Sequence, residues 1–221
     1  MASKAARCLL AAAGKPVVDI GLRRSHSPDA GLYAARASYL AGFAGTATVL
    51  AEDLFGIPLF GTMAHSFIQA HELESMAFTH FAGTQPNNII LLIDTYETEA
   101  GANKVVNLAS KLKQKGITIK GVRIDSGNLV AHAFRVRKIF DDHGLQEIKI
   151  TVSGNLDEYA IQSMVDKQAP IDLFAVGTKV TTSNDFPYMD CVYKLQEYSG
   201  RPVRKLSLIH ISEPTRPRMS T

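Results

Sequence analysis

The sequence predicts an α/β fold with parallel strands, and three observations support this prediction. From Asn88 onward, continuous apolar runs alternate with stretches whose apolar residues have helical spacing. The connections between them are short, which favours right-handed strand–helix–strand units. Four consecutive apolar runs end in polar or glycine-containing turns. An open sheet and a barrel both fit this pattern, and in both folds ligands bind at the carboxyl ends of the strands.

The region after Asn88 supplies the regular part of the predicted fold. Each expected strand is a continuous apolar run, which is typical of a sheet that is buried on both faces. The first two expected helices carry a stripe of apolar residues and are followed by a glycine, Gly116 or Gly144. The expected strands cover 89–93, 117–124, 148–152 and 171–176, and the expected helices cover 98–115, 129–140 and 157–165.

The first third of the chain is less regular and rich in small residues, which let helices approach one another closely. A helix over 8–13 is expected to stop at Gly14 and Pro16. No internal repeat is evident in the sequence. We expect short strands over 17–20 and 57–60, helices over 29–42, 46–55 and 64–74, and a further strand over 203–207.

The composition is that of a soluble globular protein and argues against several other classes of protein. Hydrophobic residues make up 46% of the chain and charged residues 20%, which argues against disorder. The net charge of +3, without a basic block, argues against nucleic-acid binding. No apolar run approaches the roughly 20 residues needed to cross a bilayer. Cys8 and Cys191 match no metal-ligand spacing and indicate reduced thiols in a cytoplasmic protein.

The four polar turns after the expected strands indicate a site for a phosphorylated ligand. Any one of them would be an ordinary turn or helix cap, but four at the same edge of a sheet are harder to dismiss. Gly154 and Gly177 leave backbone N–H groups unobstructed, and a helix N-terminus adds about half a positive charge, so these turns can cradle a phosphate. The turns are Asp94–Glu97, Arg123–Asn128, Ser153–Asn155 and Gly177–Lys179.

Charged side chains in these turns are suited to sugar phosphates. Arg123 and Asp125 stand two residues apart on an extended segment, so their side chains point to the same side. The arginine could clamp an anion, and the carboxylate could hold ribose hydroxyls or a metal-bound water. A structural ion pair is the alternative interpretation.

Two further segments carry candidate chemistry. His65 follows the Gly61–Thr62 turn at the start of an expected helix, where the helix N-terminus keeps an imidazole neutral and therefore nucleophilic. An ordinary surface or core histidine fits the pattern equally well. Arg23 and Arg24 follow a glycine turn and suit a carboxylate or a pyrophosphate, with a solvated basic turn as the alternative.

Taken together, these segments resemble the nicotinate phosphoribosyltransferase family. The motifs occur in the family's order and at matching spacing over about 2–207, which is more specific than any single motif. The resemblance implies an irregular parallel α/β barrel of the type II phosphoribosyltransferase kind, incomplete here, with part of a second domain. The motifs are Gly-Leu-Arg-Arg before Ser-Pro-Asp-Ala-Gly, Gly-Phe-Ala-Gly-Thr-Ala, Gly-Thr-Met-Ala-His-Ser-Phe, Arg-Ile-Asp-Ser-Gly-Asn, Ser-Gly-Asn-Leu-Asp-Glu, Val-Gly-Thr and Val-Tyr-Lys-Leu.

The resemblance also implies a reaction and a role for each matching residue. Nicotinate and phosphoribosyl pyrophosphate would give nicotinate mononucleotide and pyrophosphate, coupled to ATP hydrolysis, in NAD biosynthesis. Mg²⁺ would bridge pyrophosphate oxygens rather than occupy a protein cage, so no protein metal site is expected. By the matching motifs, His65 would be phosphorylated by ATP, and Arg23 would lie near the pyridine ring and the pyrophosphate. Arg123 and Asp125 would line the base and ribose site, and Asp94, Ser126 and Gly127 would bind substrate. The 5′-phosphate would be held by Gly154, Asn155, Gly177 and Thr178.

Ala47 bears on the choice of substrate within the resemblance. Related nicotinamide enzymes carry an aspartate at the matching position, and its carboxylate accepts from an amide but repels another carboxylate. Ala47 removes this repulsion, which favours nicotinate. The alternatives are a nicotinamide or quinolinate phosphoribosyltransferase, or a non-catalytic module that binds phosphate ligands.

Family members are substantially longer than this chain. We therefore expect 1–207 to be the catalytic region of an internal fragment that is inactive alone, and 208–221 to be a non-native tail. The family usually forms dimers that share residues across the interface, so we expect a homodimer at full length. The hypothesis depends on the turns with Asp125, Gly154 and Gly177 converging with His65 and Arg23 around one hollow.

Overall fold

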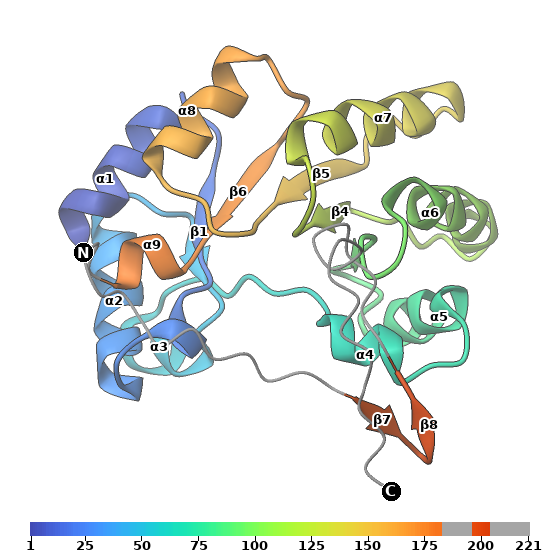
Figure 1. Ribbon diagram of the computed structural model, residues 1–221, viewed down its shortest axis with the longest axis horizontal. Coiled ribbons are helices and arrows are strands. Elements are labelled where there is room, and N and C mark those ends of the chain that lie inside the picture. The colour runs from blue at the N-terminus through green and yellow to red at the C-terminus, as the bar shows by residue number, and fades with distance from the viewer. Residues whose placement is uncertain (183–195, 204–221) are drawn as a thin grey trace, which may run out of the picture.

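Six short parallel strands form the centre of the protein, in a computed structural model that describes residues 1–182 and 196–203. Their order in the sheet is β2-β1-β6-β5-β4-β3. The sheet curls inside a ring of helices, as in an incomplete barrel (Figure 1). The strands are β1 (Val17–Asp19), β2 (Gly45–Thr46), β3 (Ile90–Leu92), β4 (Gly121–Ile124), β5 (Lys149–Val152) and β6 (Leu173–Val176).

The parallel pairing brings the carboxyl ends of these strands to one rim. Val18 of β1 pairs with Gly45 of β2 on one side and with Ala175 of β6 on the other. In the same way, Val122 of β4 lies between β3 and β5. The turns that follow the strands therefore meet at this rim, where parallel α/β folds bind ligands.

Helices cover the outside of the curled sheet (Figure 1). Several begin at a polar turn residue whose side chain accepts a hydrogen bond from the first helical turn. Asn128 accepts from the Ala131 N–H, and Asp157 accepts from the Ala160 N–H. The helices are α1 (Ala2–Ala11), α2 (Pro28–Ala41), α3 (Val49–Phe55), α4 (His65–Gln69), α5 (Glu74–Thr84), α6 (Thr98–Lys113), α7 (Leu129–Asp142), α8 (Glu158–Asp166) and α9 (Thr178–Thr181), with a 3-10 turn η1 (Leu22–Arg24) and a separate hairpin of β7 (Glu197–Tyr198) and β8 (Arg201–Pro202).

An extended segment, 57–64, crosses the open side of the sheet between the edge strands β2 and β3 (Figure 1). It starts beside β2, where the Thr46 N–H donates to the Pro58 carbonyl at 3.0 Å and the Phe60 N–H donates to the Thr46 carbonyl at 2.9 Å. It ends at α4. This segment, called the crossing segment below, brings α4 next to the strands that follow it in the chain.

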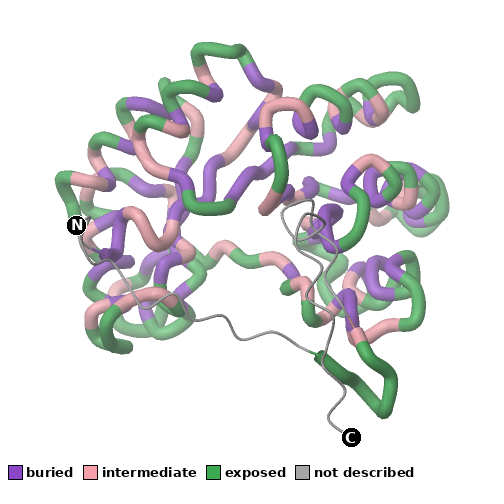
Figure 2. The backbone as a smooth tube through the Cα atoms, in the orientation of Figure 1, coloured by how far each residue is buried: buried purple, intermediate pink, exposed green. Residues whose placement is uncertain are grey.

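Buried residues concentrate on the strands and on the inner faces of the helices (Figure 2). The main core joins aromatic side chains of α5, α7 and β6, namely Phe78, Phe140 and Phe174, with the aliphatic residues of the strands. A smaller cluster packs α2 against α3. Among the described helices, none has both the length and the apolar character that a membrane span requires.

The predicted strands and helices after Asn88 are present. Most have shorter ends, whereas α7 runs to Asp142, beyond the predicted end at 140, and α8 is shifted to Glu158–Asp166. The strand expected over 117–124 begins only at Gly121, because the Ile117 N–H donates back to the Leu112 carbonyl and closes the end of α6. The helix expected over 98–115 ends at Lys113, and the strand expected over 171–176 begins at Leu173.

In the first third of the chain, the structure differs more from the predicted strands and helices. The helix expected over 46–55 begins at Val49, because Thr46 belongs to the sheet. No strand forms over 57–60, where Pro58 lacks an N–H and only Leu59 makes a single bridge to Thr46. The helix expected over 64–74 stops at Gln69, and a separate helix, α5, begins at Glu74.

Three expectations fall partly or wholly outside the described residues. They are the tail over 208–221, most of the strand expected over 203–207, and the Val-Tyr-Lys-Leu motif. The predicted part of a second domain stays a prediction.

Candidate functional site

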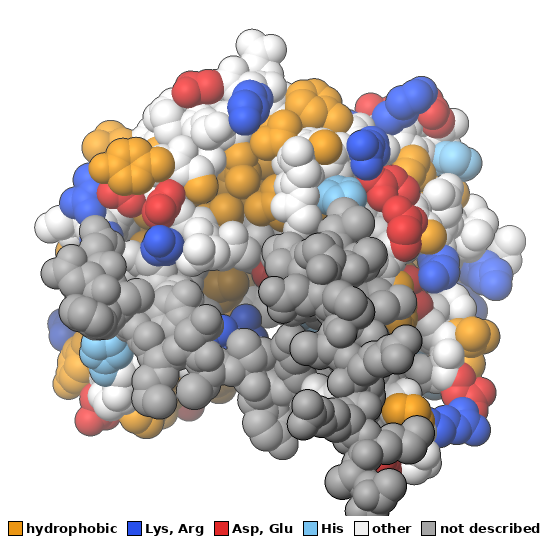
Figure 3. All heavy atoms as spheres, viewed as in Figure 1, with side chains coloured by type: hydrophobic (Ala, Val, Ile, Leu, Met, Phe, Trp, Pro, Cys, Tyr) orange, Lys and Arg blue, Asp and Glu red, His pale blue; other side chains and the backbone are white. Residues whose placement is uncertain are grey.

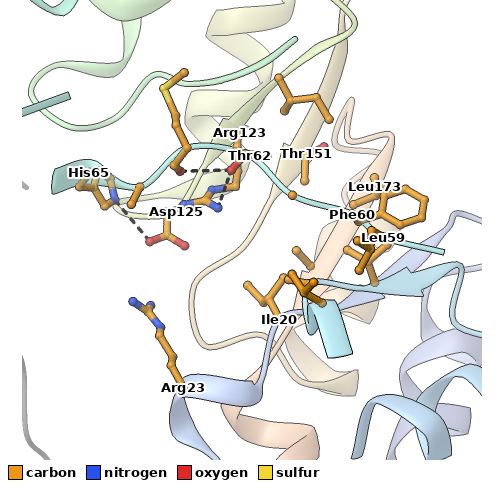
Figure 4. A pocket seen from close by; sticks show the side chains of 18 residues that line it. Ile20, Arg23, Leu59, Phe60, Thr62, His65, Arg123, Asp125, Thr151 and Leu173 are labelled. Carbon is orange, nitrogen blue, oxygen red and sulfur yellow. Dashed lines mark hydrogen bonds and ion pairs between the residues drawn. The ribbon is translucent and has the colours of Figure 1, made fainter. Parts of the chain in front are cut away.

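A cavity of about 480 Å³ lies inside the curled sheet, and the turns after the strands contribute to its wall. One end is apolar, with Ile20, Leu59, Phe60 and Leu173, and the other end carries polar and charged side chains (Figure 4). The face in Figure 3 is hollowed near its centre, where hydrophobic and basic side chains are visible. The polar end is formed by Arg23, Thr62, His65, Arg123 and Asp125.

His65 is the first residue of α4, and its ring is held on two sides. Its Nδ1 atom lies 3.0 Å from the hydroxyl of the fully buried Thr95, which follows β3. Its Nε2 atom lies 3.5 Å from Asp125 Oδ2, a long contact that is mainly electrostatic. The side chain is only 17% exposed. A ring with fixed orientation beside a carboxylate is a suitable nucleophile or proton carrier.

Asp125 stands directly after β4 and is held as a carboxylate. Burial opposes its ionisation, but the facing His65 imidazole, the Arg123 guanidinium and the Ser153 hydroxyl outweigh burial and hold its pKa well below the usual range. Ser153, after β5, donates to Asp125 Oδ1 at 2.5 Å. The pair predicted from the two-residue spacing, Arg123 and Asp125, therefore shares one end of the cavity.

Two arginines give this end a positive field. Arg123 donates to the Thr62 hydroxyl at 2.8 Å, and its Nε is buried without a hydrogen-bond partner among the described residues. Burial lowers the pKa of Arg123, and Arg23 lowers it further, while Asp125 and Asp94 act in the opposite direction. Arg23, from η1, points toward Asp125 and His65 from the exposed side (Figure 4). Two converging cations favour an anionic ligand.

Asp94 acts behind the cavity wall rather than in it. Its side chain is buried, and Oδ2 accepts hydrogen bonds from the Asp125 N–H at 2.9 Å and the Ser126 hydroxyl at 2.6 Å. The predicted substrate residue Ser126 is thus already bonded to Asp94, and Gly127 forms the turn with a φ of +75°. These residues fix the loop that presents Asp125.

The predicted phosphate turns also lie next to the cavity, and none of their residues is among those that line it. Gly154, after β5, lies against the backbone of Asp125, and Gly177, after β6, lies against the backbone of Ile20. Asn155 has a left-handed φ of +52°, and Thr178 begins α9. The structure therefore gathers His65, Arg23, Arg123, Asp125 and Ala47 around one cavity, with the glycine turns packed directly behind.

Four residues with clear structural roles had no separate role in the sequence analysis. Thr62 holds Arg123, Thr95 holds His65, Ser153 holds Asp125, and Asp19 holds the turn before Arg23. Each lies in or next to a polar turn that the sequence analysis singled out. The partners of Thr62, Thr95 and Ser153 could not be predicted, because they lie 28 or more residues away in the sequence.

Known proteins that are similar to this chain in sequence belong to one family. The Nicotinate phosphoribosyltransferase (NAPRTase) family profile matches residues 16–209. Nicotinate phosphoribosyltransferase pncB2 of Mycobacterium tuberculosis is 44% identical over 216 residues, which cover 98% of this chain and 46% of the relative. The Bacillus subtilis nicotinate phosphoribosyltransferase is 36% identical over 196 residues, or 88% of this chain and 40% of the relative. The chain spans less than half the length of these relatives.

Solved structures agree with the predicted fold. The human nicotinic acid phosphoribosyltransferase superposes with a TM-score of 0.73 at 28% identity, over 80% of this chain and 46% of the human chain. The Pyrococcus furiosus nicotinate-nucleotide pyrophosphorylase gives 0.72 at 30% identity, over 93% and 52%. These likenesses and the curled parallel sheet confirm the incomplete type II barrel. With the family profile covering most of its length, the chain belongs to the nicotinate phosphoribosyltransferase family.

Proposed function

We propose that this chain forms part of a nicotinate phosphoribosyltransferase, which joins nicotinate to the ribosyl group of phosphoribosyl pyrophosphate and couples the transfer to ATP hydrolysis. The observation that carries the proposal is the convergence of Arg23, His65, Arg123 and Asp125 at one end of a cavity whose other end is apolar. An anionic sugar phosphate and a flat pyridine ring need these two environments side by side.

The apolar end suits the pyridine ring. Leu59, Phe60 and Leu173 offer apolar surface (Figure 4). Arg23 and Arg123 lie at the other end of the cavity, where they could bind a ring carboxylate or a phosphate. Arginine binds both groups through parallel hydrogen bonds. In the proposed reaction, the pyridine nitrogen forms a bond to ribose C1 while the bond from C1 to the pyrophosphate oxygen breaks, and its electron pair leaves with pyrophosphate.

The arginines would stabilise the charge that develops on the departing pyrophosphate. Asp125, held as a carboxylate, would accept hydrogen bonds from ribose hydroxyls and stabilise the cationic sugar carbon electrostatically. No proton needs to move in this step. Holding the two reactants in line in a cavity of this size lowers the entropy cost of the transfer.

His65 is the proposed phosphate acceptor for ATP. A ring nitrogen would attack the γ-phosphorus, ADP would leave, and water would later hydrolyse the phosphohistidine. Thr95 at Nδ1 and Asp125 at Nε2 restrict the ring to one orientation. In this proposal, the histidine that is phosphorylated by ATP lines the same cavity in which the ribosyl transfer takes place.

Mg²⁺ fits this cavity as an ion that is brought by the substrate. No group of three or more His, Cys, Asp or Glu side chains in the described ranges is placed to hold a metal. Mg²⁺ commonly takes one or two carboxylates and otherwise phosphate oxygens and water. Asp125 is the carboxylate that lines the cavity and would serve this purpose. When bound, the ion would neutralise charge on pyrophosphate or ATP.

The 5′-phosphate is assigned to the turns after β5 and β6. Gly154 and Gly177 bring no side chain to this rim, and no side chain in the described part of the protein caps α9. By contrast, Asp157 already caps α8 with its own carboxylate, so an anion is less suited to that helix. Asn155 and Thr178 would supply side-chain donors beside the backbone amides.

Two further expectations are part of the proposal. Ala47 lines the cavity, so its methyl group leaves room for the carboxylate of nicotinate without repulsion. The protein is also proposed to be cytoplasmic and to form a homodimer. Large apolar side chains that stand exposed on α1, α2 and α3 and would be covered by a partner support the homodimer. They are Leu10, Leu40, Val49, Leu50 and Leu54.

A second candidate is a reaction on another pyridine carboxylate. The two arginines in the cavity wall, Arg23 and Arg123, favour it, because two cations could also bind a pyridine with two carboxylates. Binding of nicotinate, nicotinamide and quinolinate to the whole purified protein of which this chain forms part, measured by titration calorimetry, separates the three. The proposal requires nicotinate to bind most tightly.

Phosphorylation tests the catalytic role. The whole protein of which this chain forms part is incubated with γ-labelled ATP, and acid-labile, base-stable label is measured in the wild type, in His65→Asn and in His143→Asn, an exposed histidine outside the cavity. Label is expected in the wild type and in the His143 variant but not in the His65 variant. Equal label in all three, or failure of phosphoribosyl pyrophosphate to bind, would contradict the proposal.

A further inference from the structure

Asp19, the last residue of β1, is a buried carboxylate with no part in the proposed chemistry. It is 1% exposed, and no ion pair to it is found in the described ranges. Its Oδ1 accepts a hydrogen bond from the Gly21 N–H at 3.0 Å, and its Oδ2 accepts from the Thr46 hydroxyl at 2.7 Å. Burying a carboxylate without a cation is costly, so these two bonds are its main compensation.

The two bonds tie together two segments that enter the cavity. Gly21 begins the turn that carries Arg23, and Thr46 ends β2 directly before Ala47. The Thr46 hydroxyl also accepts from the Thr48 N–H at 3.0 Å, and the Ala47 N–H donates to the Asp19 carbonyl at 2.8 Å. One carboxylate thus holds the turn that carries Arg23 and the turn that carries Ala47.

Packing leaves the Gly21 turn little freedom to find another position. A Cβ added at Gly21 would lie 2.3 Å from Thr181 Cγ2 of α9 and 3.0 Å from Asp19 Oδ1. The turn is therefore enclosed between α9 and the carboxylate. Burial raises the pKa of Asp19, and the bonds from Thr46 and Gly21 counter the shift.

We propose that Asp19 is a positioning residue, which acts through the Gly21 and Thr46 turns to set the places of the Arg23 guanidinium and the Ala47 methyl group in the cavity. The inference rests on the proposed function, because it assigns Arg23 to an anionic ligand. Asp19 itself does not line the cavity and would not touch substrate.

Three variants separate positioning from general stability. Asp19→Ala removes both acceptors. Asp19→Asn keeps an oxygen for Gly21 and places an NH₂ against the Thr46 hydroxyl, which can accept it. Val136→Ala makes a cavity in the fully buried face of α7, outside the site, and lowers stability without touching either turn.

Two measurements are made on the whole purified protein of which this chain forms part. Amide hydrogen exchange reports the mobility of 20–24 and 45–48 without any ligand, and titration calorimetry with pyrophosphate reports the role of Arg23. Asp19→Ala should speed exchange in both segments and weaken pyrophosphate binding roughly tenfold or more. Asp19→Asn should restore both properties to within about threefold, and Val136→Ala should change neither while lowering the melting temperature.

Unchanged exchange and affinity in Asp19→Ala would overturn the inference. Equal losses in Val136→Ala would overturn it as well, because the effect would then be general destabilisation. If the wild type itself fails to bind pyrophosphate, the proposed function is refuted, and with it the assigned role of Arg23. The exchange data would in that case still decide whether Asp19 holds the two segments.

Discussion

The close contact between Gly154 and Asp125 makes Gly154→Ala a direct test of how the cavity is built. Gly154 has a φ of +105°, and an added Cβ would lie 2.4 Å from the Asp125 carbonyl oxygen. Real Cβ atoms essentially never approach below 3.0 Å, so this carbonyl must retreat by about 0.6 Å. The movement would be transmitted to the Asp125 carboxylate and to its hydrogen bond with Ser153.

Two effects determine the expected magnitude. A non-glycine residue in such a backbone conformation costs about 1–3 kcal/mol. Overpacking against a backbone atom costs about 1–3 kcal/mol more. We therefore expect Gly154→Ala to lower the free energy of unfolding by about 2–6 kcal/mol. At this chain length, that loss corresponds to a melting temperature roughly 4–24 °C lower.

Urea denaturation followed by circular dichroism measures this loss, with Gly83→Ala as the matched control. Gly83 lies in α5, has no positive φ, and has no atom within 4 Å of an added Cβ. Alanine should stabilise that helix by about 0.5–1 kcal/mol. A Gly154→Ala protein within about 0.5 kcal/mol of the wild type, with unchanged pyrophosphate affinity, would refute the packing argument.

Three further predictions concern charge. Ala47→Asp should weaken nicotinate binding about tenfold, which is equivalent to about 1.4 kcal/mol of repulsion. The neutral and equally large side chain of Ala47→Asn should weaken binding less. Calorimetry that gives equal losses of affinity in the two variants would exclude a charge effect. Partial burial opposes ionisation of Glu99, but contacts from Glu97, His132 and Arg135 lower its pKa to about 2. The ionised Glu99 therefore stabilises the fold fully at a pH above the ordinary pKa of about 4.5, and this stabilisation is lost as the pH falls toward 2. Glu99→Gln should flatten this acid limb in pH-dependent urea melts, and an unchanged limb would contradict the assignment. Burial raises the pKa of Cys8 to about 11, which keeps the thiol protonated at pH 8. In a Cys191→Ser background, Cys8 should therefore react with a thiol reagent at pH 8 only after the protein unfolds. Rapid labelling of the native chain would contradict the burial of Cys8.

The elements that local patterns determine could be predicted from the sequence, and those that distant partners determine could not. Helices α6, α7 and α8 agree closely with expectation, because an apolar stripe and a polar cap are local properties. The segment 46–55 has helical spacing, yet Thr46 joins the sheet. Its partners, Asp19 and Pro58, lie outside the segment and become neighbours only in the folded chain.

The same division applies to the site. Asn128, Asp157 and Asp125 all follow expected strands, and the spacing from Arg123 distinguishes Asp125 but does not reveal its partner. In the structure the first two cap helices, whereas Asp125 faces His65. The difference arises because the crossing segment brings His65 to β4, and no local pattern contains that information.

The crossing segment is therefore the part of the fold on which the site depends most directly. It supplies Thr62, which Arg123 contacts across 61 residues of sequence, and it ends at His65. The segment makes few hydrogen bonds to the sheet, since Pro58 and Phe60 both bond to Thr46 alone. A change in this segment can thus displace Arg123 and His65 while the strand pairing is kept. The curled sheet thus positions Arg123 and Asp125 at the cavity, and the crossing segment adds His65 and the Thr62 hydroxyl that holds Arg123.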